Sequence, residues 1–281
     1  MIDEKILKDV AGKFYIPPKP EILVAIQEQA NAADPDVGKM VRLVSQDVAL
    51  SAAVLRTLNS PAYGFAMKID NIQQAAMLLG IKGISTLATG FLLSKAYVGK
   101  KACISLERFW DESQQTGALC YFIGDKTSLK SYVPLESLYT LGLFHNAGIA
   151  AFAIRFPDYR EVLEAANRQP EVMLSDLENE RYRTSHAIVS YYLARSWGLP
   201  DNLCQLILEH DNPSFLRSSA ADDSKMAWAC LALVRTIQSH IRYGWDTPYW
   251  PLVESQVYEL LGIGRSDHLD FREDAEELLH G

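Results

Sequence analysis

Residues 47–80 read DVALSAAVLRTLNSPAYGFAMKIDNIQQAAMLLG and carry the strongest structural signal in the chain. Asp47 precedes an apolar run, where a carboxylate can accept a hydrogen bond from a free amide and oppose the helix dipole. Apolar residues then recur near a 3.6-residue period as far as Leu58. Because Pro61 disfavours helical angles at Ser60, the helix is predicted to end near Asn59.

Two roles are open for the polar residues at the ends of this helix. Asn59 and Ser60 are typical of helix ends, where their side chains satisfy backbone groups that lack a partner within the helix. Together with Asp47, the same side chains are also a candidate recognition corner for a binding partner. The sequence leaves both readings open, although satisfying the backbone is the more common use of such residues.

The composition is that of an ordinary globular protein. The chain has 281 residues, of which 48% are hydrophobic, enough for a large core in one helical domain or in two lobes. Its formal net charge of −8 argues against nonspecific binding to nucleic acid or anionic lipid, which depends on clustered lysine and arginine. No apolar run approaches the roughly 20 residues that span a bilayer, and no signal peptide is recognisable. We therefore expect a cytoplasmic protein with no nucleic-acid or membrane partner.

Helical periodicity continues along the whole chain, and no segment alternates in the way expected of strands. The predicted fold class is all-α. Residues 1–100 are expected to form an N-terminal lobe of about five helices with a break at Gly80 and Gly83, and residues 101–281 a C-terminal lobe. In the second lobe, helices are expected at 109–125, 135–153, 159–166, 186–197, 202–209, 225–243 and 254–261, with a loop at 245–251 and a frayed tail from Ser266.

The candidates for chemistry are three histidines of the second lobe, His145, His186 and His210, and the Asp211 that follows the last of them. Histidine titrates near neutral pH and is a common metal ligand, but a lone histidine on a helix is more often simply hydrogen-bonded. The sequence has no GxSxG nucleophile elbow and no GxxxxGK[ST] phosphate loop. Two readings, core packing or an aromatic pocket, are open for Trp197, Trp228, Trp245 and Trp250.

Residues 15–215 resemble the HDOD family of bacterial all-helical signalling modules. The resemblance rests on the 47–80 stretch and on Trp197-Gly198-Leu199-Pro200 in the second lobe. It implies a two-lobed helical bundle of the HDOD type, related to the metal-dependent HD phosphohydrolases but generally without their metal ligands. In those enzymes, histidines and aspartates hold one or two divalent ions that activate water against a phosphate ester.

Three positions that resemble ligand positions of the HD superfamily carry residues that cannot replace the ligand. The His-Asp dipeptide is His145-Asn146 here, and a neutral amide lacks the charge of a carboxylate that bridges two ions. The earlier histidine falls at Ser113 and the last aspartate at Val234. The resemblance therefore implies no catalytic residue and a degenerate pocket formed by Ser113, His145, Asn146, His186, His210 and Asp211.

The function that the resemblance favours is a non-catalytic signal-transduction module, which binds a protein partner or small ligand through the groove between the lobes. No cofactor is expected beyond at most one weakly bound divalent metal, with His145, His186 and His210 as its ligands. The alternative is a metal-dependent phosphohydrolase acting on a nucleotide or cyclic dinucleotide, and Asn146 is the residue that argues against it. A scaffold without any ligand is the third reading. The three imidazoles are expected to converge on one pocket, since losing ligands changes chemistry faster than packing.

Overall fold

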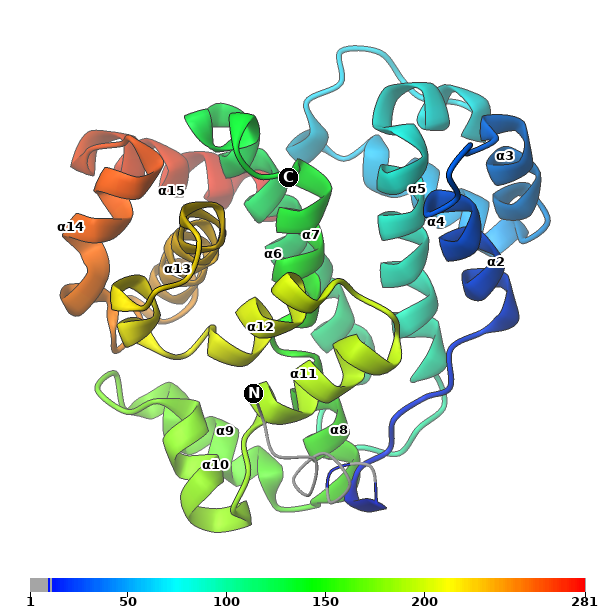
Figure 1. Cartoon of the computed structure of the whole chain (residues 1–281). Coiled ribbons are helices and arrows are strands. Elements are labelled where there is room, and N and C mark those ends of the chain that lie inside the picture. Colours follow the sequence, from blue (N-terminus) through cyan, green and yellow to red (C-terminus); the bar gives the residue numbers. More distant parts are fainter. Residues whose placement is uncertain (1–9, 11, 281) are drawn as a thin grey trace. The chain divides into compact units, whose positions relative to one another are not determined.

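The computed structural model describes residue 10 and residues 12–280, which divide into two units (Figure 1). The small unit comprises residues 17–98, and the large unit comprises residues 10, 12–16 and 99–280. Every regular element that the described residues form is a helix, so the predicted all-α class is confirmed.

The small unit consists of α2 (Glu21–Ala30), α3 (Val37–Ser45), α4 (Val48–Leu58) and α5 (Ile72–Ala96), with a 3-10 turn at Pro61–Tyr63. Helix α5 contacts each of the other three helices. Helix α4 begins where the sequence predicts, because the Asp47 side chain accepts a hydrogen bond from the Leu50 N–H at 3.0 Å. Lys95 of α5 lies 3.5 Å from the same carboxylate and adds a cation beside this helix start.

Helix α5 is kinked at Gly80, inside the break that the sequence predicts. Gly80 has φ 68° and ψ 176°, a combination that is essentially restricted to glycine because a Cβ atom would clash with the backbone. The kink separates two segments of helix that the periodicity predicts as separate helices. A glycine therefore sets the course of the longest helix in the small unit.

Two helical segments, Ile72–Ala96 and Leu135–Arg155, are long and apolar enough to cross a membrane by length and composition alone. In the most apolar 18-residue stretch of each segment, 56% and 83% respectively is buried inside the protein. Core helices of globular proteins have the same composition, because their apolar side chains face other helices. Packing within the protein therefore accounts for most of this apolar character.

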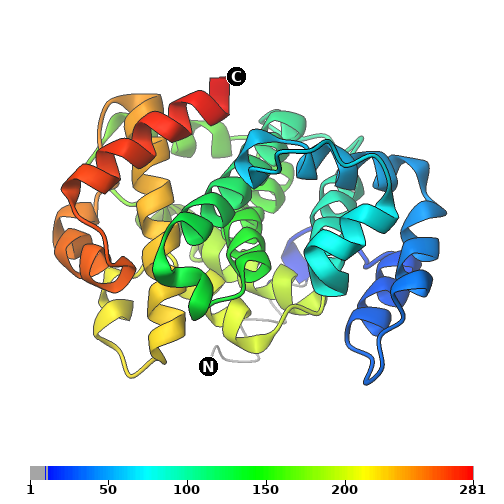
Figure 2. The ribbon, with the colours of Figure 1, turned by 90° about the horizontal axis from the view of Figure 1, so that it is seen from above.

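The large unit contains the remaining helices, and among them α6 contacts both α7 and α13. Helix α15, red in Figure 2, also packs against α13. The helices are α6 (Leu106–Lys126), α7 (Leu135–Phe144), α8 (Ala147–Arg155), α9 (Tyr159–Arg168), α10 (Leu174–Tyr182), α11 (His186–Ser196), α12 (Asp201–Glu209), α13 (Asp222–Tyr243), α14 (Trp250–Leu261) and α15 (Arg265–His280), with 3-10 turns at Ser128–Ser131 and Pro213–Arg217.

Several expectations for this unit were wrong. The helix predicted at 135–153 is two helices, α7 and α8, interrupted at His145 and Asn146. Helix α14 begins inside the predicted 245–251 loop, because a proline is tolerated in the first turn of a helix. The tail from Ser266 is helical, since Phe271 packs edge-on against Phe122. Helix α10 was not predicted, because its sequence LSDLENERY is mostly polar.

The start of the chain also departs from the predicted division, which placed residues 1–100 in one lobe. Phe14 packs on Phe152 with ring centroids 4.8 Å apart, and Val10 belongs to the same hydrophobic cluster. The described part of residues 1–16 therefore groups with the large unit rather than with residues 17–98.

Asn59 ends α4 and ties it to the loop before α5. Its amide nitrogen donates to the carbonyl oxygens of Leu55 at 2.9 Å and Ile69 at 2.8 Å, and its amide oxygen accepts from the Ile69 N–H at 2.8 Å. The neighbouring Ser60 hydroxyl donates to the Thr57 carbonyl at 2.7 Å. Both side chains thus satisfy backbone groups, which supports the helix-end reading of these residues.

The substitution Asn59→Ala is expected to lower the free energy of unfolding by about 1–3 kcal/mol, because the Ile69 N–H and carbonyl lose their partner in a partly buried loop. Urea unfolding monitored by circular dichroism measures this change. Asn31→Ala is the matched control: Asn31 is exposed, also ends a helix, and is expected to change stability by less than about 0.5 kcal/mol. Equal effects of the two substitutions would contradict the prediction.

Candidate functional site

Three helix ends bring the three histidines together in the large unit. His145 follows α7, His186 is the first residue of α11, and His210 follows α12. Contacts of α12 with α7 and with α11 hold these ends in place. The last carbonyls of a helix lack intrahelical partners, and the rings use them: His145 Nδ1 lies 2.7 Å from the Gly142 oxygen and His210 Nδ1 lies 2.7 Å from the Ile207 oxygen.

Gly148 allows α8 to approach the start of α11 closely. A Cβ atom on Gly148 would lie 2.2 Å from the carbonyl oxygen of His186, which is too close for any side chain. In this approach the Gly148 N–H donates to the Ser190 hydroxyl at 2.8 Å. The backbone just after His145 therefore fixes the position of His186.

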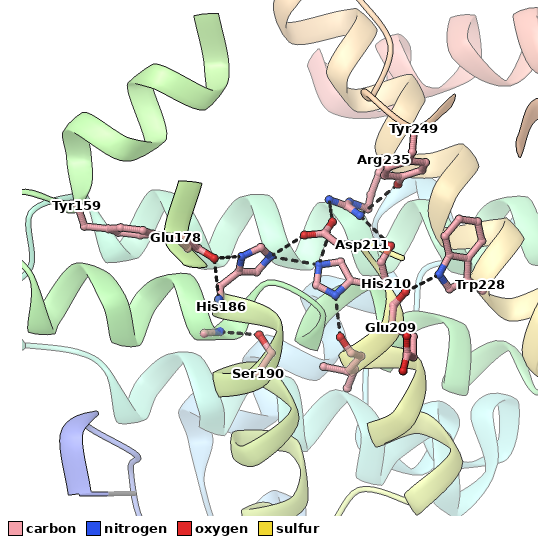
Figure 3. Close-up of polar contacts among 12 residues, drawn as sticks. Tyr159, Glu178, His186, Ser190, Glu209, His210, Asp211, Trp228, Arg235 and Tyr249 are labelled. Atoms are coloured by element: carbon pink, nitrogen blue, oxygen red, sulfur yellow. Dashed lines mark hydrogen bonds and ion pairs between the residues drawn. The ribbon is translucent and has the colours of Figure 1, made fainter. Parts of the chain in front are cut away.

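A buried chain of hydrogen bonds runs from Tyr159 through Glu178 and His186 to His210 (Figure 3). The Tyr159 hydroxyl donates to Glu178 Oε1. Glu178 Oε2 accepts from the His186 N–H at 2.7 Å and lies 2.7 Å from His186 Nδ1. His186 Nε2 is 3.2 Å from His210 Nε2. Glu178 is fully buried and both histidines are 1% exposed, so solvent does not reach this chain.

Arg235 and Asp211 extend the cluster (Figure 3). Arg235 Nη2 donates to Asp211 Oδ1 at 2.8 Å, while Nη1 donates to the His210 carbonyl at 3.2 Å and to the Tyr249 hydroxyl at 3.1 Å. Asp211 Oδ2 lies 3.6 Å from His186 Nε2 and makes no hydrogen bond to a described residue.

His145 lies next to this cluster, with its ring centroid 5.2 Å from that of His210. The ring centroids of His186 and His210 are also 5.2 Å apart. The structure therefore brings the three imidazoles together in one cluster, as the resemblance implied, but of the three only His145 lines the groove beside it.

The hydrogen bonds assign the protons of the three imidazoles. The Nδ1 atoms of His145 and His210 face carbonyl oxygens, which only accept, so each Nδ1 carries a hydrogen. Burial lowers the pKa of His210 to about 3 and holds the pKa of His145 well below its usual value, so both rings are neutral. His210 Nε2 is then an acceptor, and the hydrogen between the two Nε2 atoms belongs to His186.

His186 is therefore an imidazolium that donates to Glu178 through Nδ1 and to His210 through Nε2. Burial by itself would lower the pKa of His186, but the Glu178 carboxylate and Asp211 outweigh it and raise the pKa above its usual value. Burial would likewise raise the pKa of Asp211, but the positive charges of Arg235 and His186 outweigh it and hold the pKa below its usual range. The cluster thus pairs two carboxylates with two cations, which avoids the cost of an isolated buried charge.

A groove of about 770 Å³ opens beside the cluster, and all of its lining residues belong to the large unit. Of the predicted pocket residues, Ser113, His145, Asn146 and Asp211 line this groove, whereas His186 and His210 do not. Asn146 Oδ1 and Asp211 Oδ2 are buried acceptors without a hydrogen-bond partner among the described residues. The charged side chains of the lining are Arg108, Arg160, Arg235, Arg242, Glu112, Glu164, Asp211 and Asp246, so the two signs balance.

Two of the three positions that match metal-ligand positions of HD enzymes have structural roles. The Ser113 hydroxyl donates to the Phe109 carbonyl of the preceding helical turn at 2.9 Å. Val234 is fully buried in the hydrophobic core. Of the four tryptophans considered for an aromatic pocket, Trp245 lines the groove, whereas Trp197, Trp228 and Trp250 are buried in the core.

The candidate recognition corner lies in the small unit, and the structure does not bring its members together. Asp47 begins α4, whereas Asn59 and Ser60 follow its last residue. At about 1.5 Å per residue the two ends of this helix are roughly 16 Å apart. All three side chains bond to backbone groups of their own helix or the adjoining loop.

Sequence reasoning missed Glu178 and Arg235, the two charged groups that hold the cluster together. Glu178 lies in the polar run Asp176-Leu177-Glu178-Asn179-Glu180-Arg181, which is indistinguishable from a solvated helix face. Arg235 did give a signal, because it follows the apolar run Leu231-Ala232-Leu233-Val234, and an arginine next to a buried segment requires a partner.

Residues 16–213 match the family model of the HDOD domain. The chain belongs to the HDOD family. An uncharacterised protein of Treponema pallidum (strain Nichols) is 25% identical to it over 209 residues, which cover 74% of this chain and 40% of that protein. This HDOD chain therefore spans less than half the length of that relative.

Solved structures share the HDOD fold. An HDOD domain protein with unknown function from Geobacter sulfurreducens is 20% identical, with a TM-score of 0.69 and coverage of 98% of each chain. For a candidate phosphohydrolase from Shewanella amazonensis SB2B the identity is 20%, the TM-score 0.71 and the coverage 97% of this chain and 93% of that one. A candidate signal transduction protein from Marinobacter aquaeolei VT8 has 21% identity, a TM-score of 0.70 and coverage of 99% and 59%. The fold is thus common to proteins named for hydrolysis and for signalling.

The relationship to metal-dependent phosphohydrolases raises the question of whether these residues suit a metal. His186, His210 and Asp211 offer ligand atoms that all lie within 4.8 Å of one another. The two Nε2 atoms are 3.2 Å apart, close to the roughly 3.3 Å between ligands of a tetrahedral ion bound at about 2 Å. His186 Nε2 lies 3.6 Å from Asp211 Oδ2, and His210 Nε2 lies 3.6 Å from Asp211 Oδ1. By the spacing and type of their ligand atoms, these residues fit one ion. The set contains Asp211 in place of the predicted ligand His145.

A second ion does not fit. The positions matched to further ligands hold Ser113, Asn146 and Val234, of which only Asn146 has an oxygen that is free of a hydrogen bond. A neutral amide oxygen does not offset the repulsion between two divalent ions. The residues present therefore suit at most a single metal ion.

Mild acid is expected to destabilise the large unit through His145 and His210. Their pKa values in the folded protein lie below the unfolded value of about 6.5, so the stability they contribute is complete above pH ~6.5 and is lost as the pH falls. Each such group lowers the free energy of unfolding by up to about 1.4 kcal/mol per pH unit. His186 acts in the opposite direction: its raised pKa gives stability that is complete below pH ~6.5 and is lost as the pH rises through its folded-state pKa.

Urea unfolding at several pH values between 5 and 7 measures this dependence. The variant His145→Gln lacks one of the two groups and is expected to lose less stability between pH 7 and pH 5 than the wild type. The same slope in both proteins would show that His145 takes up no proton on unfolding and would contradict the assignment of a buried neutral ring.

Proposed function

We propose that this chain is a non-catalytic signal-transduction module of the HDOD family, which binds a small ligand or a protein partner in the groove of the large unit. The observation that carries the proposal is a groove of about 770 Å³ lined by Asn146 and Asp211, whose buried oxygens Asn146 Oδ1 and Asp211 Oδ2 have no hydrogen-bond partner among the described residues. Buried polar atoms are normally satisfied, so these two oxygens call for donors from outside the chain.

The chemistry of the groove indicates what kind of ligand fits. Because both unpartnered atoms are acceptors, the ligand presents N–H or O–H donors to them. Arginines and carboxylates balance in the lining, so electrostatics favour neither a strong anion nor a strong cation. Tyr243 and Trp245, stacked with ring centroids 5.8 Å apart, add an aromatic part to the lining. A small, polar molecule with an amide or amino group on a planar body meets these conditions, as does a side chain of a partner protein.

The proposed absence of catalysis is supported by the residues that would have to serve a metal-assisted hydrolysis. Activation of water and stabilisation of a leaving oxygen in phosphate chemistry commonly use two ions with bridging carboxylates. Here Asn146 replaces the aspartate of the His-Asp dipeptide of HD enzymes. Ser113 and Val234, at two further ligand positions, have structural roles and offer no metal ligand. We also propose a cytoplasmic protein with no nucleic-acid or membrane partner; the net charge of −8 supports the absence of these partners.

The alternative, a metal-dependent phosphohydrolase acting on a nucleotide or cyclic dinucleotide, is favoured by one observation. His186, His210 and Asp211 could hold a single ion, and Glu178 bonds to His186 Nδ1 as carboxylates do for metal-bound imidazoles. A bound ion would supply a Lewis acid that activates water. The protein's own residues would then have to orient the phosphate ester through the arginines of the groove.

Protein purified without chelator is expected to show no hydrolysis of bis-p-nitrophenyl phosphate, nucleotides or cyclic dinucleotides in added Mn²⁺, because ligands for a second ion are missing. The rate is compared with that of His210→Ala, which removes one of the three possible ligands. Metal-dependent turnover in the wild type that this substitution abolishes would establish the alternative.

Ligand binding in the groove is tested by obstructing it. A library of amides, amines and heterocycles with N–H donors is screened by thermal shift, and dissociation constants of the compounds that bind are measured by calorimetry. Asn167→Trp places a large side chain at the lining and is expected to weaken binding at least tenfold. The adjacent Arg168→Trp is the control, since Arg168 is exposed and does not line the groove. Binding that is equally strong in both variants would place the ligand elsewhere.

A further inference from the structure

We propose that Arg235 is a tethered cation that takes the place of a metal ion beside Asp211, and that neutralising Arg235 turns His186, His210 and Asp211 into a site for one divalent ion. This inference concerns metal affinity and does not depend on the ligand proposed for the groove.

The position of Arg235 is fixed at three points. Its guanidinium donates to Asp211 Oδ1, to the His210 carbonyl and to the Tyr249 hydroxyl, at 2.8, 3.2 and 3.1 Å. Its side chain is only 17% exposed, and the Asp211 side chain is 9% exposed. The guanidinium therefore cannot leave Asp211 for solvent without breaking several hydrogen bonds in a largely buried setting.

The remaining features of the triad suit a metal. Two imidazole nitrogens and one carboxylate oxygen lie within 4.8 Å of one another, and Asp211 Oδ2 has no hydrogen-bond partner among the described residues. Glu178 accepts from His186 Nδ1, which leaves Nε2 as the atom for an ion. Nitrogen and carboxylate ligands in this combination suit Zn²⁺ and Co²⁺.

The balance of charge explains why Arg235 decides the outcome. The buried carboxylates of Glu178 and Asp211 carry two negative charges, and the ligand form of the histidines is neutral. A divalent ion alone would balance the two carboxylates. With the guanidinium present as well, the ion leaves an excess positive charge in a buried site, where charge repulsion is only weakly screened.

The substitution Arg235→Met removes this charge at similar length. After removal of metal with a chelator, binding of Co²⁺ to the full chain is followed by calorimetry and by the visible absorption of the ion. The affinity of Arg235→Met is expected to exceed that of the wild type at least tenfold, and its thermal midpoint is expected to rise on addition of Co²⁺. The double variant Arg235→Met/His210→Ala is expected to lose this gain, because it lacks a ligand.

Two controls separate charge from packing. Arg235→Lys keeps the positive charge and is expected to bind Co²⁺ no more tightly than the wild type. Arg242→Met removes another arginine from the same helix and the same groove lining, and is also expected to behave as the wild type does. If Arg235→Met does not fold, Arg235→Gln makes the same comparison, because its amide can bond to Asp211 without a charge.

The proposal is overturned if the wild type binds Co²⁺ as tightly as the neutral variants do. It is equally overturned if Arg235→Lys gains affinity as Arg235→Met does, since the gain would then come from altered packing. Tight binding that survives His210→Ala would place the ion outside the triad.

Discussion

The buried carboxylate of Glu178 is the constraint on which the arrangement of the large unit depends. A fully buried carboxylate is costly unless donors surround it, and Glu178 meets three: the Tyr159 hydroxyl, the His186 N–H and the His186 ring. Tyr159 belongs to α9, His186 to α11 and Glu178 to α10. One side chain thus joins three helices and orients the imidazole that contacts His210.

The site is built from interruptions of helices. The break between α7 and α8 places His145 and Asn146 beside the groove, and the end of α12 presents His210 and Asp211. Carbonyls left free at these ends accept from the ring Nδ1 atoms, which fixes the two neutral tautomers. The Nε2 atoms of His145 and His210 are therefore acceptors, and His186 is the ring that carries the additional proton.

Arginine and histidine side chains of this HDOD protein balance the buried carboxylates that a metal ion would otherwise balance. The ligand atoms of the triad are close enough for an ion, yet Arg235 and the imidazolium of His186 already balance Asp211 and Glu178. Asn146 Oδ1 and Asp211 Oδ2, which belong to residues lining the groove, are buried acceptors without a hydrogen-bond partner among the described residues. A ligand with a donor group could satisfy these acceptors, which is the basis of the proposed binding role.

Periodicity and capping chemistry, both local properties, allowed the sequence by itself to determine the all-α class, the start of α4 at Asp47 and the break at Gly80. The family resemblance supplied His145, His186 and His210. Only the tertiary structure decided that Glu178 is buried rather than solvated, that Arg235 pairs with Asp211, and that α7 ends at Phe144. The reason is that burial and charge pairing depend on residues far apart in the chain, brought together by close helix contacts such as that of Gly148 with α11, and a local pattern does not contain them.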